Sequence, residues 1–180
     1  MEETIRLWSI MGAIFVMIAG SLFHFIYEWS AENPIVGIFG AVNESSWEHL
    51  KLLFWPSLLI SFLEYIVIGK SIPNFLPAKA VTLYLGIFLI LVLFYTYTGI
   101  LGKNYLILDI LVFIISVLIS EYVGYFIMTG DQIFHWKVIQ LSVFAILLLA
   151  AAFIVFTFYP PALPLFLDPV SGKYGMRNEK

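Results

Sequence analysis

The segment Val138–Tyr159, VIQLSVFAILLLAAAFIVFTFY, contains no charged residue and decides the class to which this chain belongs. A helix needs about 20 predominantly apolar residues to cross a lipid bilayer, and this segment is long enough to do so. The whole chain has the same character, with 62% hydrophobic residues, 12% charged residues and a mean hydropathy of +0.98. Soluble domains carry about 25% charged residues, so we expect much of the apolar surface to face lipid.

Four further segments are long and apolar enough to cross a bilayer, which predicts an all-α, polytopic transmembrane helix bundle. The five expected spans are 5–29, 50–68, 80–100, 105–128 and 138–159. The breaks between them carry Gly, Pro, Asn or charged residues, as turns do. We expect residues 1–159 to form the bundle. Residues 160–180 are rich in proline, which excludes a regular helix, and are expected to form an interfacial tail packed on the bundle.

Charge and cysteine content exclude several classes of function. The net charge is −3 and the basic residues stand singly, so there is no basic patch of the kind that binds nucleic acid. The chain has no cysteine, and this excludes disulfides and thiolate metal ligands. The expected partner is the lipid bilayer, in a multi-pass protein of the cell membrane. A homo-oligomer is compatible with this composition.

Ionisable side chains gather where the first predicted span ends and the second begins. His24 and Glu28 are four residues apart, as are Glu44 and Glu48, so each predicted helix would present two of them on one face. His49 adds a second imidazole next to them. Imidazole and carboxylate donors without thiolates suit Zn²⁺, Mn²⁺ or Fe²⁺. The sequence therefore predicts a site for a divalent cation or small polar ligand, with the metal ligands His24, Glu28, Glu44 and His49.

Two interpretations of the residues that begin the second span remain open. In a metal-dependent membrane hydrolase a metal-bound water would be the nucleophile, with Glu44 or Glu48 as the base and Lys51 stabilising negative charge. The alternative for Glu48 is structural. Ser45 and Glu48 have the spacing of a capping box, in which the serine caps the helix and the glutamate reaches back to the serine amide.

Ionisable residues within or beside the other spans support a different class of function. Glu64 and Glu121 lie inside the second and fourth spans, Asp109 begins the fourth, and His135 precedes the fifth. A carboxylate in a bilayer needs a partner or a proton, and His135 or Lys137 are the expected partners of Glu121. Because such acids occur in proton relays, a small proton- or cation-coupled transporter is the first alternative. A structural or assembly subunit, in which these groups only fix helix register, is the second.

Three stretches carry a resemblance to a known family. They are FHFIYEW (Phe23–Trp29), NESSWEHLK (Asn43–Lys51) and PPALPLFLDPVSGKYGM (Pro160–Met176). In these stretches the chain resembles an uncharacterised family of small prokaryotic integral membrane proteins, and the second stretch is the most specific part. The resemblance covers nearly the whole chain. It implies about five helices in a prokaryotic plasma membrane, and it implies no activity.

Overall fold

The computed structural model describes residues 1–176, and this part of the chain is all-α, as predicted. Its α-helices are α1 (Glu2–Phe23), α2 (Ile26–Trp29), α3 (Pro34–Gly37), α4 (Ser46–Val67), α5 (Phe75–Leu101), α6 (Leu106–Thr129) and α7 (Trp136–Phe158). Two short 3₁₀ helices, η1 (Gly69–Ser71) and η2 (Pro164–Phe166), follow α4 and α7. The last four residues of the predicted tail, 177–180, lie outside the described residues.

Five of these helices, α1, α4, α5, α6 and α7, are long and apolar enough to cross a membrane. They correspond to the five predicted spans and indicate a multi-pass membrane protein whose outer surface contacts lipid. The predicted first span is wrong at its end, because α1 stops at Phe23 rather than continuing to residue 29. The helix is interrupted at His24 and Phe25, before the short helix α2. This break lets Tyr27 turn inward, where its ring packs beside Gly37.

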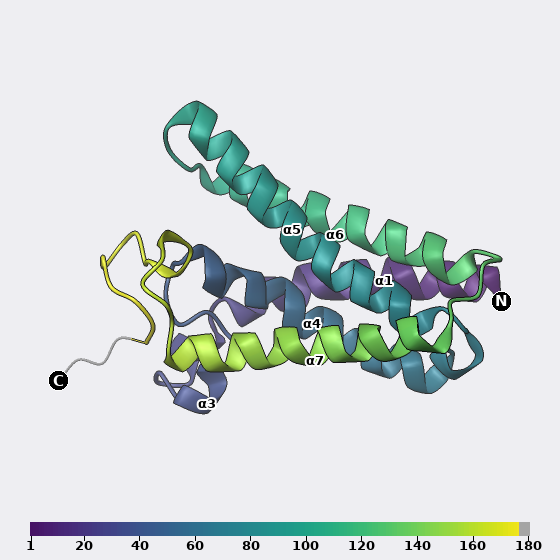
Figure 1. Ribbon diagram of the computed structural model, residues 1–180. Coiled ribbons are helices and arrows are strands. Elements are labelled where there is room, and N and C mark those ends of the chain that lie inside the picture. The colour runs from purple at the N-terminus through teal and green to yellow at the C-terminus, as the bar shows by residue number, and fades with distance from the viewer. Residues whose placement is uncertain (177–180) are drawn as a thin grey trace.

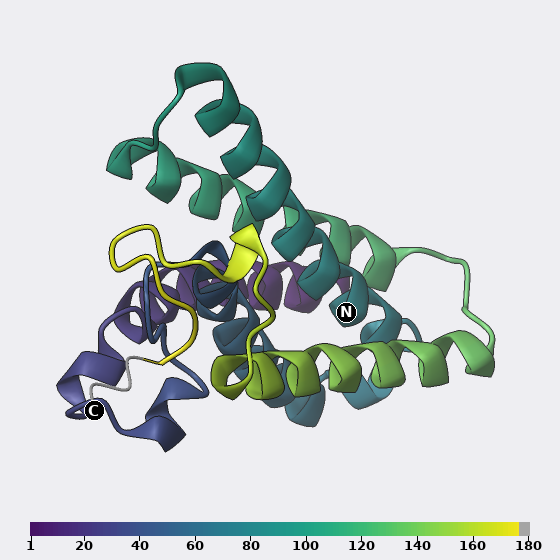
Figure 2. The same ribbon diagram turned by 60° about the vertical axis from the view of Figure 1, so that its left-hand side comes forward.

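The helices form a bundle with one diverging hairpin. α5 and α6 pack along each other as an antiparallel pair, and their connecting turn points away from the other helices in both views (Figures 1 and 2). α1 packs against α4 and α6, and α7 packs against α5. The N-terminus lies at one end of the bundle, here called the N-terminal end. α1 ends, α4 begins and α7 ends at the opposite end, here called the histidine end (Figure 1).

A backbone-to-backbone contact joins α1 to α4. A Cβ atom on Gly20 would lie 2.5 Å from the carbonyl oxygen of Leu52, so no other residue fits at this position without moving a helix. Pro56 lies inside α4, four residues after Leu52. Because proline has no amide hydrogen, it cannot donate the intrahelical bond to the Leu52 carbonyl. That carbonyl instead faces the glycine of α1, where only a residue without a side chain leaves it room.

The described part of the tail packs on the histidine end. The Phe166 side chain is buried, and its ring contacts the rings of Trp47 and Phe156. The Asn43 side-chain amide donates a hydrogen bond of 2.9 Å to the Gly175 carbonyl. The tail is therefore held to α4 and α7 by the Phe166 ring and to the loop before α4 by the hydrogen bond from Asn43.

Candidate functional site

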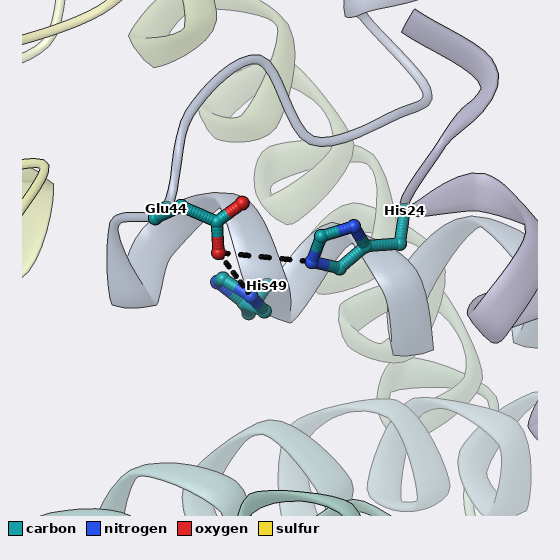
Figure 3. A group of neighbouring side chains, drawn as sticks. All are labelled: His24, Glu44 and His49. Carbon is teal, nitrogen blue, oxygen red and sulfur yellow. Dashed lines mark ion pairs between the residues drawn. The ribbon is translucent and has the colours of Figure 1, made fainter. Parts of the chain in front are cut away.

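The carboxylate of Glu44 lies between two imidazole rings at the histidine end. Its Oε2 atom is 3.7 Å from Nε2 of His24 and 3.5 Å from Nε2 of His49. Figure 3 shows both rings directed towards the same carboxylate oxygen. One ligand atom from each of the three residues lies within 4.8 Å of the others, so the group could hold a single metal ion.

Each of these side chains is positioned by the end of a helix. His24 follows the last residue of α1. Glu44 immediately precedes Ser45, the N-cap of α4, and His49 lies in the first turns of that helix. Nδ1 of His49 is 2.9 Å from the carbonyl oxygen of Ser45. Because a carbonyl only accepts hydrogen bonds, Nδ1 carries the hydrogen, and Nε2 of a neutral His49 faces Glu44 with its lone pair.

Two hydrogen-bond acceptors, Nε2 of His49 and Oε2 of Glu44, face each other here unless a proton or metal ion lies between them. A neutral His49 would direct a lone pair at a carboxylate oxygen 3.5 Å away, which is repulsive. In the metal-free protein, the interaction with the Glu44 carboxylate raises the pKa of His24 above its usual value, against the opposing effect of burial. The same interaction with His24 lowers the pKa of Glu44. The site therefore favours a bound proton or another cation.

A pocket of about 200 Å³ opens beside the cluster, with His24 and Glu44 in its wall. Among the described residues, its lining includes two more carboxylates, Glu28 and Glu32, and the buried Tyr27, but no lysine or arginine. The pocket is therefore acidic and suits a cationic or neutral polar ligand better than an anion. Glu28 lines this pocket but lies outside the three-residue group, because the break after α1 removes it from the helical face that it was expected to share with His24.

Glu48 and Lys51 are buried near the start of α4 and do not line the pocket. Both side chains are almost fully buried, and Nζ of Lys51 is 2.5 Å from Oε2 of Glu48. Lys51 also donates hydrogen bonds to the Gly37 carbonyl (2.7 Å) and to Oγ1 of Thr157 (3.0 Å). These bonds join α4 to α3 and α7.

The capping box predicted at the start of α4 forms only in part. Ser45 caps the helix, since its hydroxyl accepts a hydrogen bond from the Glu48 amide. The predicted reciprocal bond to the Ser45 amide does not form, because the Glu48 carboxylate accepts a hydrogen bond from the amide of Val42, at 3.0 Å. The Ser45 amide donates instead to the side-chain oxygen of Asn43. Glu48 therefore anchors the loop before α4 through the Val42 amide.

Glu64 and Glu121 both lie close to Lys79, a partner that was not predicted from the sequence. Nζ of Lys79 lies 2.7 Å from Glu64 and 3.6 Å from Glu121. The expected pairing of Glu121 with His135 or Lys137 is wrong: His135 is an exposed N-cap of α7 whose ring accepts from the Lys137 amide. Lys79 was missed because it directly precedes an apolar run and resembles an ordinary interfacial lysine.

Asp109 lies near the turn between α5 and α6 and contacts residues of that turn. Its carboxylate accepts hydrogen bonds from the Tyr97 hydroxyl and the Asn104 side chain, all near the α5–α6 connection. That connection lies at the tip of the diverging hairpin (Figure 1). The residue therefore stabilises the turn between the two helices.

The chain belongs to the family of unknown function DUF6512, whose family model matches residues 1–176. No curated protein and no solved structure matches the chain. The expectation of an uncharacterised family is met, and membership assigns no activity. What the protein does has to be inferred from the geometry of its own residues.

Proposed function

We propose that the protein binds a divalent metal ion, Zn²⁺ before Mn²⁺ or Fe²⁺, through His24, His49 and Glu44. The observation that carries the proposal is the convergence of their ligand atoms within 4.8 Å. Bonds of about 2.0–2.1 Å to a tetrahedral Zn²⁺ place two ligand atoms about 3.3–3.5 Å apart. The two separations from Glu44 are 3.5 and 3.7 Å, and all three ligand atoms lie within 4.8 Å of one another, so side-chain movements of about 1 Å would close the site on an ion.

The donor set also indicates the kind of chemistry. Two histidines and one glutamate are a known ligand set of catalytic zinc, in which the fourth position is left for water or substrate. A zinc ion held by His24, His49 and Glu44 would activate water as a nucleophile near neutral pH. We therefore propose a metal-dependent hydrolase at one face of the cell membrane, acting on a cationic or neutral polar group in the acidic pocket.

The burial of the other acids changes the roles assigned to them within this proposal. Glu44 is a ligand, which makes it a poor proton acceptor. Glu48 is buried against Lys51, so we assign both a structural role in holding the loop. Glu28 lines the pocket and is exposed. We propose it as the general base.

Metal analysis of the full-length protein, purified without chelator and titrated with Zn²⁺, is the direct test. We expect one tightly bound ion per chain. Loss of a second-sphere partner costs about 10–100-fold in metal affinity, so removing a ligand in His24→Ala, His49→Ala or Glu44→Gln should cost at least about 100-fold. Glu3→Gln, an exposed carboxylate in the first turn of α1, is the matched control and should bind like wild type. A wild-type protein that binds no divalent metal, or ligand variants that bind like the control, would refute the proposal.

Transport is the second candidate, and one observation favours it: charged residues lie buried together on α4, α5 and α6. The serines around them argue for a closed interior. Ser116 and Ser120 donate to carbonyls of their own helix. Close packing fills the space beside them, since a Cβ on Gly86 would touch Leu53 at 2.8 Å and Ser120 at 3.2 Å. Proteoliposomes with an internal pH dye test transport: a proton flux lost in Glu64→Gln and Glu121→Gln would favour this candidate.

A structural or assembly subunit is the simplest alternative to both. It requires neither a bound metal nor a proton flux. The metal titration and the flux assay together therefore separate the three classes.

A further inference from the structure

Three helices bring one lysine and two glutamates together near the N-terminal end of the bundle. Lys79 of α5 lies between Glu64 of α4 and Glu121 of α6. All three side chains are nearly inaccessible, with exposed fractions of 1–5%. The group lies inside the helices rather than at their ends, because Glu121 is eight residues, or about 12 Å at 1.5 Å per residue, before the last residue of α6.

The two carboxylates are not equivalent. Glu64 holds Lys79 through a charge-assisted hydrogen bond of 2.7 Å. Glu121 lies 3.6 Å from the same nitrogen, which is too long for a hydrogen bond. Among the described residues, neither oxygen of Glu121 has a hydrogen-bond partner, and Oε1 of Glu64 also has none. Buried carboxylate oxygens without a donor are rare, so one ammonium group does not satisfy the two carboxylates.

In the described part of the chain, α1 presents no charged side chain to Glu121. α1 presents Gly12 to Glu121, where a Cβ would lie 3.7 Å from the carboxylate. Ser9, one turn earlier on α1, is also buried, and its hydroxyl has no partner among the described residues. The charged groups that act on Glu121 are therefore Lys79 from α5 and Glu64 from α4. Two carboxylates share one ammonium group.

We propose that Glu64, Lys79 and Glu121 form an exchangeable proton-binding site inside the bundle, with the proton on Glu121. One proton makes the group electrically neutral, and an unbalanced charge is costly in a membrane interior. A metal ion fits less well, because the Lys79 ammonium already occupies the space between the carboxylates and repels cations. The site is separate from the proposed metal centre, which lies at the histidine end.

Infrared difference spectroscopy of the full-length protein in lipid nanodiscs tests this site. At neutral pH the wild type should show the carbonyl stretch of a protonated carboxylic acid, and the band should shift in D₂O. Glu121→Gln should lose the band because it removes the proton carrier. Glu64→Gln should also lose it, because one lysine then faces one carboxylate and Glu121 ionises.

Glu3→Gln is the control and should keep the band at wild-type intensity. Glutamine is nearly isosteric with glutamate, and unchanged helical circular dichroism and elution volume establish that each variant is folded. A wild type without the band at neutral pH would overturn the proposal whatever the variants do. A band that persists in both Glu121→Gln and Glu64→Gln would overturn it as well.

Discussion

The ammonium group of Lys51 is bound to the carboxylate of Glu48, 2.5 Å away and almost entirely out of contact with solvent. The pair lies one turn of α4 apart in sequence, yet it organises three other segments. Glu48 holds the Val42 amide, and Lys51 holds the Gly37 carbonyl and the Thr157 hydroxyl. The loop that presents Glu44 is therefore anchored from beneath by this pair.

Lys51→Met should strongly destabilise the protein, because it leaves the Glu48 carboxylate buried without a counter-charge. Removing one partner of a buried pair costs about 3–5 kcal/mol, whereas replacing both by apolar residues is often neutral. We therefore expect Lys51→Met/Glu48→Leu to recover much of the loss in thermal unfolding followed in one detergent. Lys70→Met changes an exposed lysine and should stay within about 0.5 kcal/mol of wild type. Equal stability of Lys51→Met and wild type would contradict the anchoring role.

Gly20→Ala should destabilise the packing of α1 on α4, because the added methyl group meets the Leu52 carbonyl at 2.5 Å. Overpacking of this kind costs about 1–3 kcal/mol. Gly99→Ala is the matched control: this glycine is also helical and nothing lies within 4 Å of an added Cβ. Alanine there should be neutral or stabilising by about 0.5–1 kcal/mol. If the two alanine variants unfold alike, the close contact is not limiting.

Phe166→Ala should release the tail from the bundle, since it removes the ring that packs on Trp47 and Phe156. Loss of a buried phenylalanine costs about 3–5 kcal/mol. When cleavage follows local opening, its rate tracks the open population, so limited proteolysis within residues 160–176 should accelerate at least about 100-fold. Val170→Ala alters a largely exposed tail residue and should leave the rate unchanged. Similar rates for the two variants would place the anchor elsewhere.

His24 should titrate above its ordinary pKa of 6.5 in the metal-free protein, because Glu44 stabilises its charged form. A raised folded-state value contributes stability fully below pH 6.5 and loses it as the pH rises through the higher value. The lowered pKa of Glu44 acts in the other direction: its contribution is present above pH 4.5 and fades as the pH falls through the lower value. Because Glu44 is nearly half exposed, the pair is worth about 1 kcal/mol or less.

Histidine NMR resolves this titration directly. Glu44→Gln should bring the His24 midpoint back towards 6.5, and Glu3→Gln should leave it where it is in wild type. Zn²⁺ needs the deprotonated imidazole, so metal affinity should fall as the pH drops below the His24 midpoint. A midpoint at or below 6.5 in wild type would contradict the effect assigned to Glu44.

Hydropathy was enough to predict the five long helices, because lipid requires a long apolar run wherever the chain crosses. It was not enough to place the end of the first one. Residues 24–29 are as compatible with a helix as those before them, and the break accompanies a contact of Tyr27 with Gly37, further along the chain, that no local pattern indicates.

The grouping of His24, Glu44 and His49 could be predicted because the connection between two consecutive membrane crossings begins and ends at the same end of the bundle. The spacing argument that paired Glu44 with Glu48 was less useful. α4 begins at Ser46, so Glu44 lies outside the helix and the two carboxylates point to different places. Lys79 could not be paired with Glu121 from sequence, because the two residues lie far from the turn on opposite arms of the α5–α6 hairpin, and no local sequence pattern indicates the contact.

The two clusters are completed at different stages of synthesis, because they lie on different parts of the chain. His24, Glu44 and His49 all belong to the part of the chain that ends with the first turns of α4. All three lie on the first two membrane crossings and the loop between them, which leave the ribosome before the rest of the chain. The group on Glu64, Lys79 and Glu121 requires α6 as well. A metal at the first site would therefore join the earliest two crossings during synthesis, while the proton site is completed only when the fourth has been inserted.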